Sequence, residues 1–172
     1  MNSHEVAMIR TCLILSVLLF ANTSVFADTR EEKVAKAIKE MESDVPKKRA
    51  EAAEEVGKIA AIRASYGKPA IEPMLKLLKD KEEIVRAAAA DALAKVDDPK
   101  QTVKPLTDLV KDDKSEKVRI AAANGLGTMG ESAKESVKVL RETAEQARKD
   151  MKMQLAQACQ RALQNINGPR KK

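Results

Sequence analysis

One stretch of the chain repeats itself, and this repeat limits the possible folds more than any other feature of the sequence. The segment at 70–94 is followed by a similar segment at 102–127. Two arginines in matching surroundings, Arg86 and Arg119, lie 33 residues apart. A fixed period of this size is typical of repeat proteins, in which each unit stacks on the next. The sequence therefore predicts a stack of small helical or strand units.

Apolar residues recur at helical spacing on both sides of this repeat, and no segment alternates with the period of two expected of a strand. Residues 28–166 are therefore predicted to form an all-α solenoid of about four antiparallel helix pairs. The second helix of each pair is rich in alanine, which lets neighbouring backbones approach closely. In the first pair, Glu51 and Glu55 replace apolar residues of the later pairs. This is expected of a terminal pair that faces water.

Turn and cap residues predict where the helices begin and end. Thr29 with Glu32, and Ser132 with Glu135, have the spacing of a capping box. Pro46 suits a first helical turn, and Gly130 suits a helix end. The segment 64–69 has the composition of a loop. Further residues that could cap a helix are Asp80, Thr102, Asp113 and Asp150.

The order of features within the repeat resembles HEAT repeats, in particular the short bacterial type first noted in phycobilisome lyases. The matching positions are Pro73 and Pro105 in the first helix, Asp80 and Asp112 in the turn, and Val85-Arg86 and Val118-Arg119 in the second helix. The resemblance is weaker at 30–60, where Asp44 and Arg49 have the right order, and weakest at 136–166. It implies a ladder between neighbouring repeats, with a structural role for Asp80, Arg86, Asp112 and Arg119.

The first 27 residues have the pattern of a secretory signal peptide. A polar lead ending at Arg10 precedes an apolar run from Cys12 to Phe20, which is shorter than the roughly 20 residues of a spanning helix. The segment 24–27 then places residues that a signal peptidase accepts at the −3 and −1 positions before Asp28, so cleavage is expected after Ala27. We therefore expect an exported protein, periplasmic or secreted, without stable insertion in a membrane. Its basic tail, 167–172, is expected to be disordered.

The residue content of the mature chain argues against an enzyme. After cleavage it has no histidine, and its one thiol is Cys159. A thiol nucleophile without histidine lacks its usual activating base. Cys159 also falls on the apolar stripe, at the place of Ala89 and Ala122, which favours a packing role. We therefore expect no catalytic residue, no metal site and no cofactor.

A second motif, at 125–130, matches the glycine pattern of dinucleotide-binding loops. That loop needs a strand before it and a helix that starts within it. Here the motif falls at the end of a predicted helix. Gly125 and Gly127 are therefore expected to permit close packing, and Gly130 to end the helix.

The net charge of +6 raises the question of nucleic acid, but single-strand binders usually add aromatic side chains for stacking. The mature chain has one aromatic residue, Tyr66, so no nucleic-acid partner is expected. We expect a non-catalytic scaffold or adaptor whose second-helix face binds a partner protein. Two alternatives stay open. One is an accessory or chaperone subunit for a cofactor-attaching enzyme or another enzyme, and the other is a structural protein held to an anionic envelope surface by charge.

Overall fold

Eight α-helices and two 3₁₀ helices make up the described part of the protein, residues 29–96 and 98–168 of a computed structural model. The predicted signal peptide, 1–27, and residues 169–172 of the predicted tail lie outside the described residues. Asn167 belongs to the last helix rather than to the tail. The elements are α2 (Arg30–Glu40), α3 (Pro46–Ile62), η1 (Ala64–Ala70), α4 (Ile71–Leu77), α5 (Glu83–Leu93), α6 (Pro99–Asp112), α7 (Glu116–Met129), η2 (Gly130–Ser136), α8 (Val137–Lys149) and α9 (Met153–Asn167).

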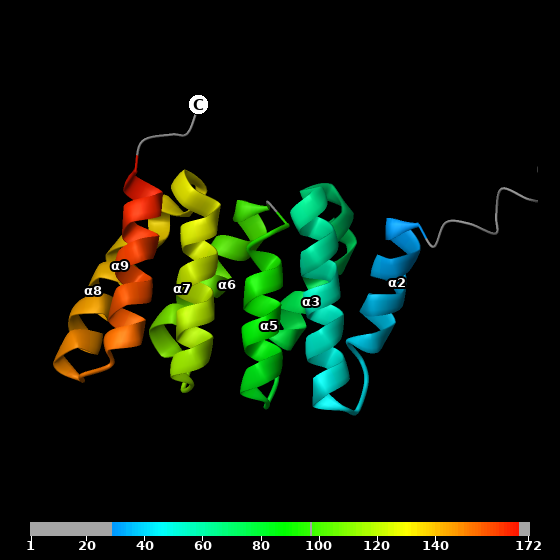
Figure 1. Cartoon of the computed structure of the whole chain (residues 1–172), viewed down its shortest axis with the longest axis horizontal. Helices are drawn as coiled ribbons and strands as arrows, with labels where there is room; N and C mark the ends of the chain where they lie inside the picture. Colours follow the sequence, from blue (N-terminus) through cyan, green and yellow to red (C-terminus); the bar gives the residue numbers. More distant parts are fainter. Residues whose placement is uncertain (1–28, 97, 169–172) are drawn as a thin grey trace, which may run out of the picture.

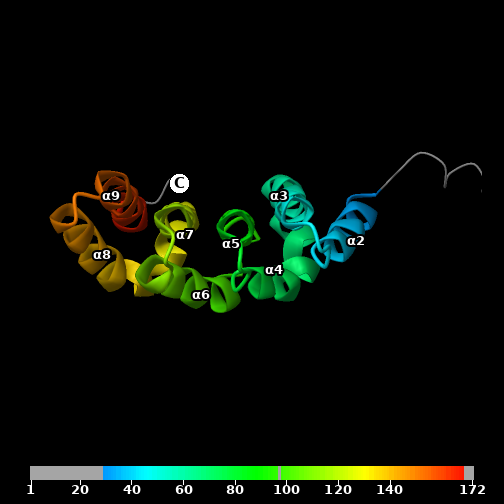
Figure 2. The ribbon, with the colours of Figure 1, turned by 90° about the horizontal axis from the view of Figure 1, so that it is seen from below.

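Successive helix pairs stack side by side into a short curved solenoid (Figure 1). Helices α3, α5, α7 and α9 form an inner layer on the concave side, and α4, α6 and α8 form an outer layer on the convex side (Figure 2). Helix α2 packs against α3 at the N-terminal end of the stack. The predictions of an all-α fold and of a helical solenoid are thus confirmed.

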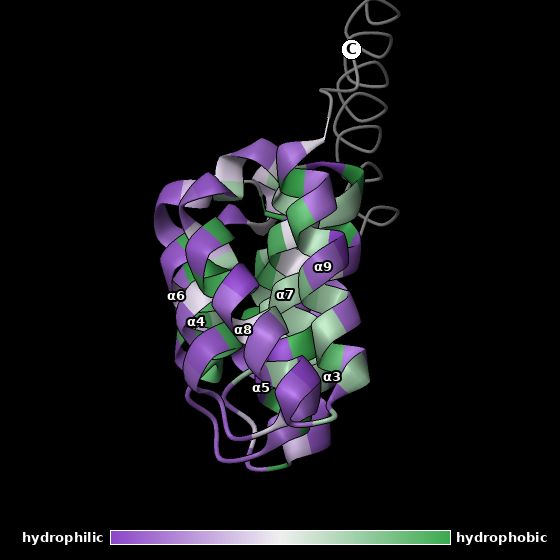
Figure 3. Ribbon diagram, turned by 90° about the vertical axis from the view of Figure 1, so that its left-hand side faces the viewer, coloured by the Kyte–Doolittle hydropathy of each residue, from purple (hydrophilic) through white to green (hydrophobic). Residues whose placement is uncertain are grey.

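The core lies between the two layers, where apolar faces meet and polar faces turn to water (Figure 3). Equivalent positions of the repeat are buried in the same way: Val85 matches Val118, and Leu93 matches Leu126. Because a helix pair is apolar on the faces toward its neighbours, it buries those faces only when the next pair stacks on it.

Small residues bring the inner helices close together. A Cβ atom added to Gly125 would lie 2.9 Å from the Cβ of Ala94, and one added to Gly127 would lie 2.9 Å from the Cα of Ala162. Gly130 ends α7 with φ +57°, a conformation that favours glycine. All three glycines thus have the packing and termination roles that the sequence predicted.

Several helix ends lie where the cap residues in the sequence predicted them. Thr29 and Glu32 form a capping box: the Glu32 amide donates to Thr29 Oγ1 over 3.3 Å, and the Thr29 amide donates to Glu32 Oε2 over 3.0 Å. Pro46 is the first residue of α3. Both ends rely on local chemistry that does not depend on the rest of the fold.

Other predicted ends were wrong. Thr102 caps no helix, because α6 already begins at Pro99; its buried hydroxyl donates to the Asp98 carbonyl instead. Ser132 and Glu135 form no capping box, because 130–136 is a 3₁₀ helix. The predicted loop at 64–69 also lies within a 3₁₀ helix.

The last turn differs from its prediction as well. Asp150 ends α8 instead of starting α9, and α9 begins only at Met153. Between them Met151 has φ 60°, which is uncommon for a residue with a side chain. This turn therefore has a different backbone path from the earlier turns.

The close approach of α7 and α9 can be tested with Gly127→Ala. The added methyl group would press on the backbone of α9, where a flexible side chain cannot move aside. We expect the free energy of unfolding to fall by about 1–2 kcal/mol, although alanine is the better helix former. Urea unfolding followed by circular dichroism measures this.

Asn124→Ala is the matched control, because Asn124 lies on the exposed side of the same helix. It should leave stability unchanged or raise it by a few tenths of a kcal/mol. Equal effects of the two substitutions would contradict the close approach.

Candidate functional site

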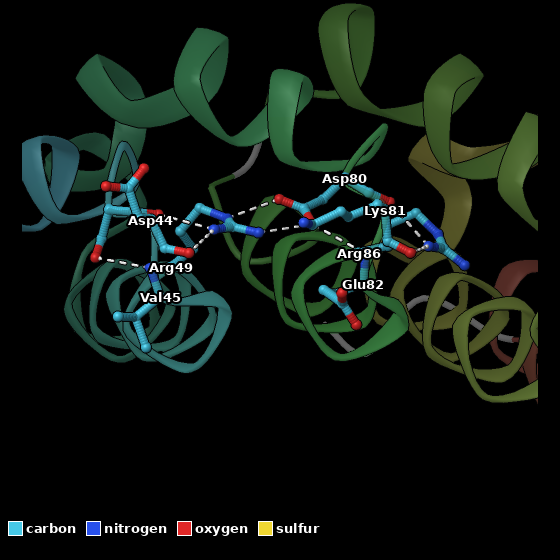
Figure 4. A network of polar contacts seen from close by, with 8 residues as sticks. Asp44, Val45, Arg49, Asp80, Lys81, Glu82 and Arg86 are labelled. Carbon is cyan, nitrogen blue, oxygen red and sulfur yellow. Dashed lines mark hydrogen bonds and ion pairs between the residues drawn. The ribbon is translucent and has the colours of Figure 1, made fainter.

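Two arginines of the inner helices each bind an aspartate of the next repeat. Figure 4 shows the first of these pairs, Arg49 with Asp80. Arg49 donates from Nε and Nη2 to the carboxylate of Asp80, over 2.8 and 2.9 Å. Arg86 donates in the same way to Asp113, over 2.7 and 2.9 Å. The Arg86 and Asp113 side chains are only 6% exposed. We call these two pairs the Arg–Asp ladder.

Each pair also holds the turns that precede two inner helices. The Nη1 group of each arginine donates to the carbonyl six residues earlier, from Arg49 to Ser43 and from Arg86 to Asp80, both over 2.8 Å. Each aspartate accepts a hydrogen bond from the backbone amide two residues later. One side-chain pair therefore fixes its own turn and the next one.

The ladder keeps its carboxylates ionised. Burial by itself would raise the pKa of Asp80 and of Asp113. Hydrogen bonds from the paired arginine and from a backbone amide outweigh burial, so both pKa values lie below the ordinary value. The ion pairs therefore persist when the solution becomes mildly acidic.

The structure places the second ladder carboxylate at Asp113 and not at Asp112. Asp112 is the last residue of α6 and is exposed, whereas Asp113 follows in an extended conformation and reaches Arg86. The alignment of the prolines, 32 residues apart, pointed to Asp112. The constant distance of six residues between aspartate and arginine, as from Asp80 to Arg86, would have indicated Asp113.

The first repeat, where the resemblance was weaker, also contributes to the ladder. Arg49 is a full member of the ladder, although only Arg86 and Arg119 were predicted as its arginines. Six residues before Arg49 lies Ser43, and not Asp44. Its hydroxyl accepts a hydrogen bond from the Val45 amide, as the ladder aspartates do in their own turns.

Arg119, the other predicted ladder arginine, makes no ion pair with any aspartate in the described part of the chain. Its Nε donates to the carbonyl of Val110 over 2.8 Å. Asp150 follows Arg119 by 31 residues, the same distance as from Arg49 to Asp80. The carboxylate of Asp150 instead accepts a hydrogen bond from Gln146, in the turn with the unusual backbone path.

Groups suited to catalysis are scarce in the described residues. Cys159 is fully buried, and burial raises the pKa of its thiol to about 11. Among residues 29–96 and 98–168, no three His, Cys, Asp or Glu residues are grouped so that they could hold a metal ion. Cys159 therefore has the packing role that its place on the apolar stripe predicted.

Tyr66, the aromatic residue considered for stacking, already has cationic partners. The guanidinium carbons of Arg30 and Arg63 lie 5.8 and 5.7 Å from the centre of its ring. These distances are typical of cation–π contacts. The ring thus helps to join α2 to the segment that follows α3.

The concave face carries one row of exposed side chains at equivalent repeat positions. Glu54, Asp91, Asn124 and Arg161 lie on α3, α5, α7 and α9, spaced by 37, 33 and 37 residues. All four are exposed. Charge along this row changes from acidic at α3 to basic at α9, and Asp91 is paired with Lys95, four residues later, over 2.6 Å. We call it the concave row.

The convex side contains a groove between α4 and α6, with a volume of about 740 Å³. Its apolar part is formed by Leu75 of α4, by Leu78 directly after α4, and by Pro105 and Leu109 of α6. Charged residues complete its lining, among them Asp112. This exposed aspartate thus borders a groove instead of joining the ladder.

Comparisons with known proteins agree with this geometry. The family model described as HEAT repeats matches residues 34–114 and 71–160. The crystal structure of an engineered protein is similar, with a TM-score of 0.62 and 25% sequence identity over 79% of this chain. The match covers 63% of that protein, so this chain spans less than two thirds of its length. No curated protein matches.

No helix within 29–168, residue 97 aside, combines the length and the apolar character needed to cross a bilayer.

The ladder predicts unequal effects of two matched substitutions. Arg86→Gln leaves the buried carboxylate of Asp113 without its counter-ion, so the free energy of unfolding should fall by about 3 kcal/mol. Arg119→Gln removes one hydrogen bond to a carbonyl and should cost about 1 kcal/mol or less. Urea unfolding of both variants and the wild type compares them. A loss at Arg119 as large as the loss at Arg86 would show that the two arginines have the same role.

Proposed function

The chain belongs to the HEAT repeat family, and we propose that it is a non-catalytic scaffold that binds a partner protein on its concave face. HEAT repeats form helical scaffolds that typically mediate protein interactions. Curved solenoids present extended concave surfaces for this purpose. The choice of the concave face is our own inference from the residues exposed there.

The observation that carries the proposal is the concave row. Four exposed side chains repeat across four inner helices that the Arg–Asp ladder and close packing hold in place. Because the row is acidic at Glu54 and basic at Arg161, with Asp91 between them paired to Lys95, its two ends fit an elongated partner with the opposite order of charges. Such complementarity favours one orientation and speeds encounter.

The absence of catalysis is also part of the proposal. Its support is chemical: the predicted mature chain lacks histidine, and its one thiol is buried with a raised pKa. A thiolate, and not a thiol, is the reactive nucleophile. A protein-binding role needs none of these groups.

We further propose that the protein is exported, with the signal peptide removed after Ala27. The order of a polar lead, an apolar run and small residues before Asp28 supports this. N-terminal sequencing of the protein from its natural host should read Asp28 first. A mature protein that still begins at Met1 would contradict export by this route.

The concave row can be tested by reversing its charges. In the triple variant Glu54→Lys/Asp91→Lys/Arg161→Glu, a partner matched to the row should be held at least about tenfold more weakly, since rows of like charge then face each other. Wild type and variant are immobilised, exposed to extract of the host at moderate salt, and the retained proteins are quantified by mass spectrometry.

Glu142→Lys is the matched control: it changes the net charge by the same amount, on the outer helix α8. It should retain the same partner as the wild type. If wild type, triple variant and control all retain the same proteins in equal amount, the concave row is not the binding surface. Circular dichroism shows whether each variant is folded.

A further inference from the structure

The second exposed feature of the molecule, the groove between α4 and α6, lies on the opposite side from the concave row. Its apolar part is formed by Leu75 of α4 and Leu78 directly after it, and by Pro105 and Leu109 of α6. Leu75 and Leu109 are half-buried, so apolar surface remains open to solvent there. The groove volume of about 740 Å³ falls in the range of sites that bind ligands.

The groove arises from the local build of the outer layer. Helix α4 has only 7 residues, because the chain before it, Ala64–Ala70, is a 3₁₀ helix. Helices α4 and α6 also pack less closely than α6 and α8 do. The two outer helices therefore leave a trough between them, with the inner helices behind it.

The two edges of the groove differ in net charge. Glu72, Lys76 and Lys79 line it from α4 and the turn after it, while Asp108, Asp112 and Asp113 line it from α6 and the residue after it. Asp108 is paired with Lys104, and Asp113 with Arg86 of the ladder. The remaining charged groups have no ion-pair partner among the described residues, which leaves a net positive charge on the α4 edge and a net negative charge on the α6 edge.

We propose that the α4–α6 groove binds an amphipathic helix of a partner protein. The helix would lay an apolar stripe on the leucines and Pro105. Its acidic edge would face Lys76 and Lys79, and its basic edge would face Asp112. Helices bind in grooves of this kind through apolar anchors spaced three and four residues apart. The inference rests on the proposed role in protein binding, but not on the concave face.

Three synthetic peptides of about 15 residues, long enough to form a helix, test the groove directly. Each has the same leucine stripe. The first has glutamates on one side of the stripe and lysines on the other; the second has glutamates on both sides, and the third lysines on both. Binding of each labelled peptide to the full-length protein is measured by fluorescence anisotropy at low salt. The first peptide should bind the wild type about fivefold more tightly than either companion.

The variant Lys76→Glu/Lys79→Glu makes both edges of the groove acidic. The preference should then change to the peptide with lysines on both sides. As a control, Lys68→Glu/Lys138→Glu makes the same change of charge at exposed positions outside the groove and should keep the wild-type order of affinities. A helix that lies in the groove in the reversed direction presents its acidic and basic edges to the opposite sides. Two peptides of mixed charge could therefore both fit, so the test compares mixed charge with uniform charge.

Four results would overturn the inference. The wild type could bind no peptide or all three equally, or the order of affinities could stay the same in Lys76→Glu/Lys79→Glu. Sedimentation could instead show a wild-type dimer that the same variant dissociates, which would make a second copy of the chain the occupant. None of these results involves the concave row, so the groove and the proposed function can fail independently.

Discussion

The bidentate ion pair between Arg86 and Asp113 links two neighbouring repeats and fixes two turns of the chain at once. It joins the second repeat to the third, and each of its members also orders the turn before an inner helix. The pair of Arg49 and Asp80 does the same one repeat earlier. Because these turns set where α5 and α7 begin, they also set the positions of the concave row and of the α4–α6 groove.

Close packing of the inner helices completes this arrangement. Alanine and glycine at the contacts between α5, α7 and α9 leave no room for larger side chains, as the contact of Gly127 with Ala162 shows. A buried ion pair alone is weak evidence for stability, since removing charges from water is costly. Here the apolar contacts stabilise the stack, and the ladder selects the register in which neighbouring pairs meet.

The sequence was sufficient to predict the architecture, because the period of the repeat and the helical spacing of apolar residues follow directly from how helices pack. Cap residues were less reliable guides. Asp113 looks like a helix cap, yet its carboxylate binds Arg86, and Thr102 lies inside a helix that begins at Pro99. A single letter cannot show which of several partners a polar side chain will have, since that depends on neighbours distant in the chain.

The candidate surfaces were harder to predict, for a related reason. The exposed positions of the concave row follow from the repeat, so that row could have been found by aligning the inner helices. The groove could not, because it depends on how far apart α4 and α6 lie and on the 3₁₀ helix that shortens α4. Asp112 and Asp113 illustrate the difference: both border the groove, but only Asp113 joins the ladder, and a shift of one residue between two alignments decides which of them is predicted to do so.

Arginine side-chain NMR during an acid titration tests the ladder most directly. Asp80 and Asp113 have lowered pKa values, so the ion pairs should stay intact until the pH falls below about 4, the ordinary range of aspartate, and break at lower pH. The Nε–H signals of Arg49 and Arg86 should then shift together, while that of Arg119, which donates to a carbonyl, should not follow the titration. If all three signals respond alike, or none responds, the ladder does not hold the repeats in register.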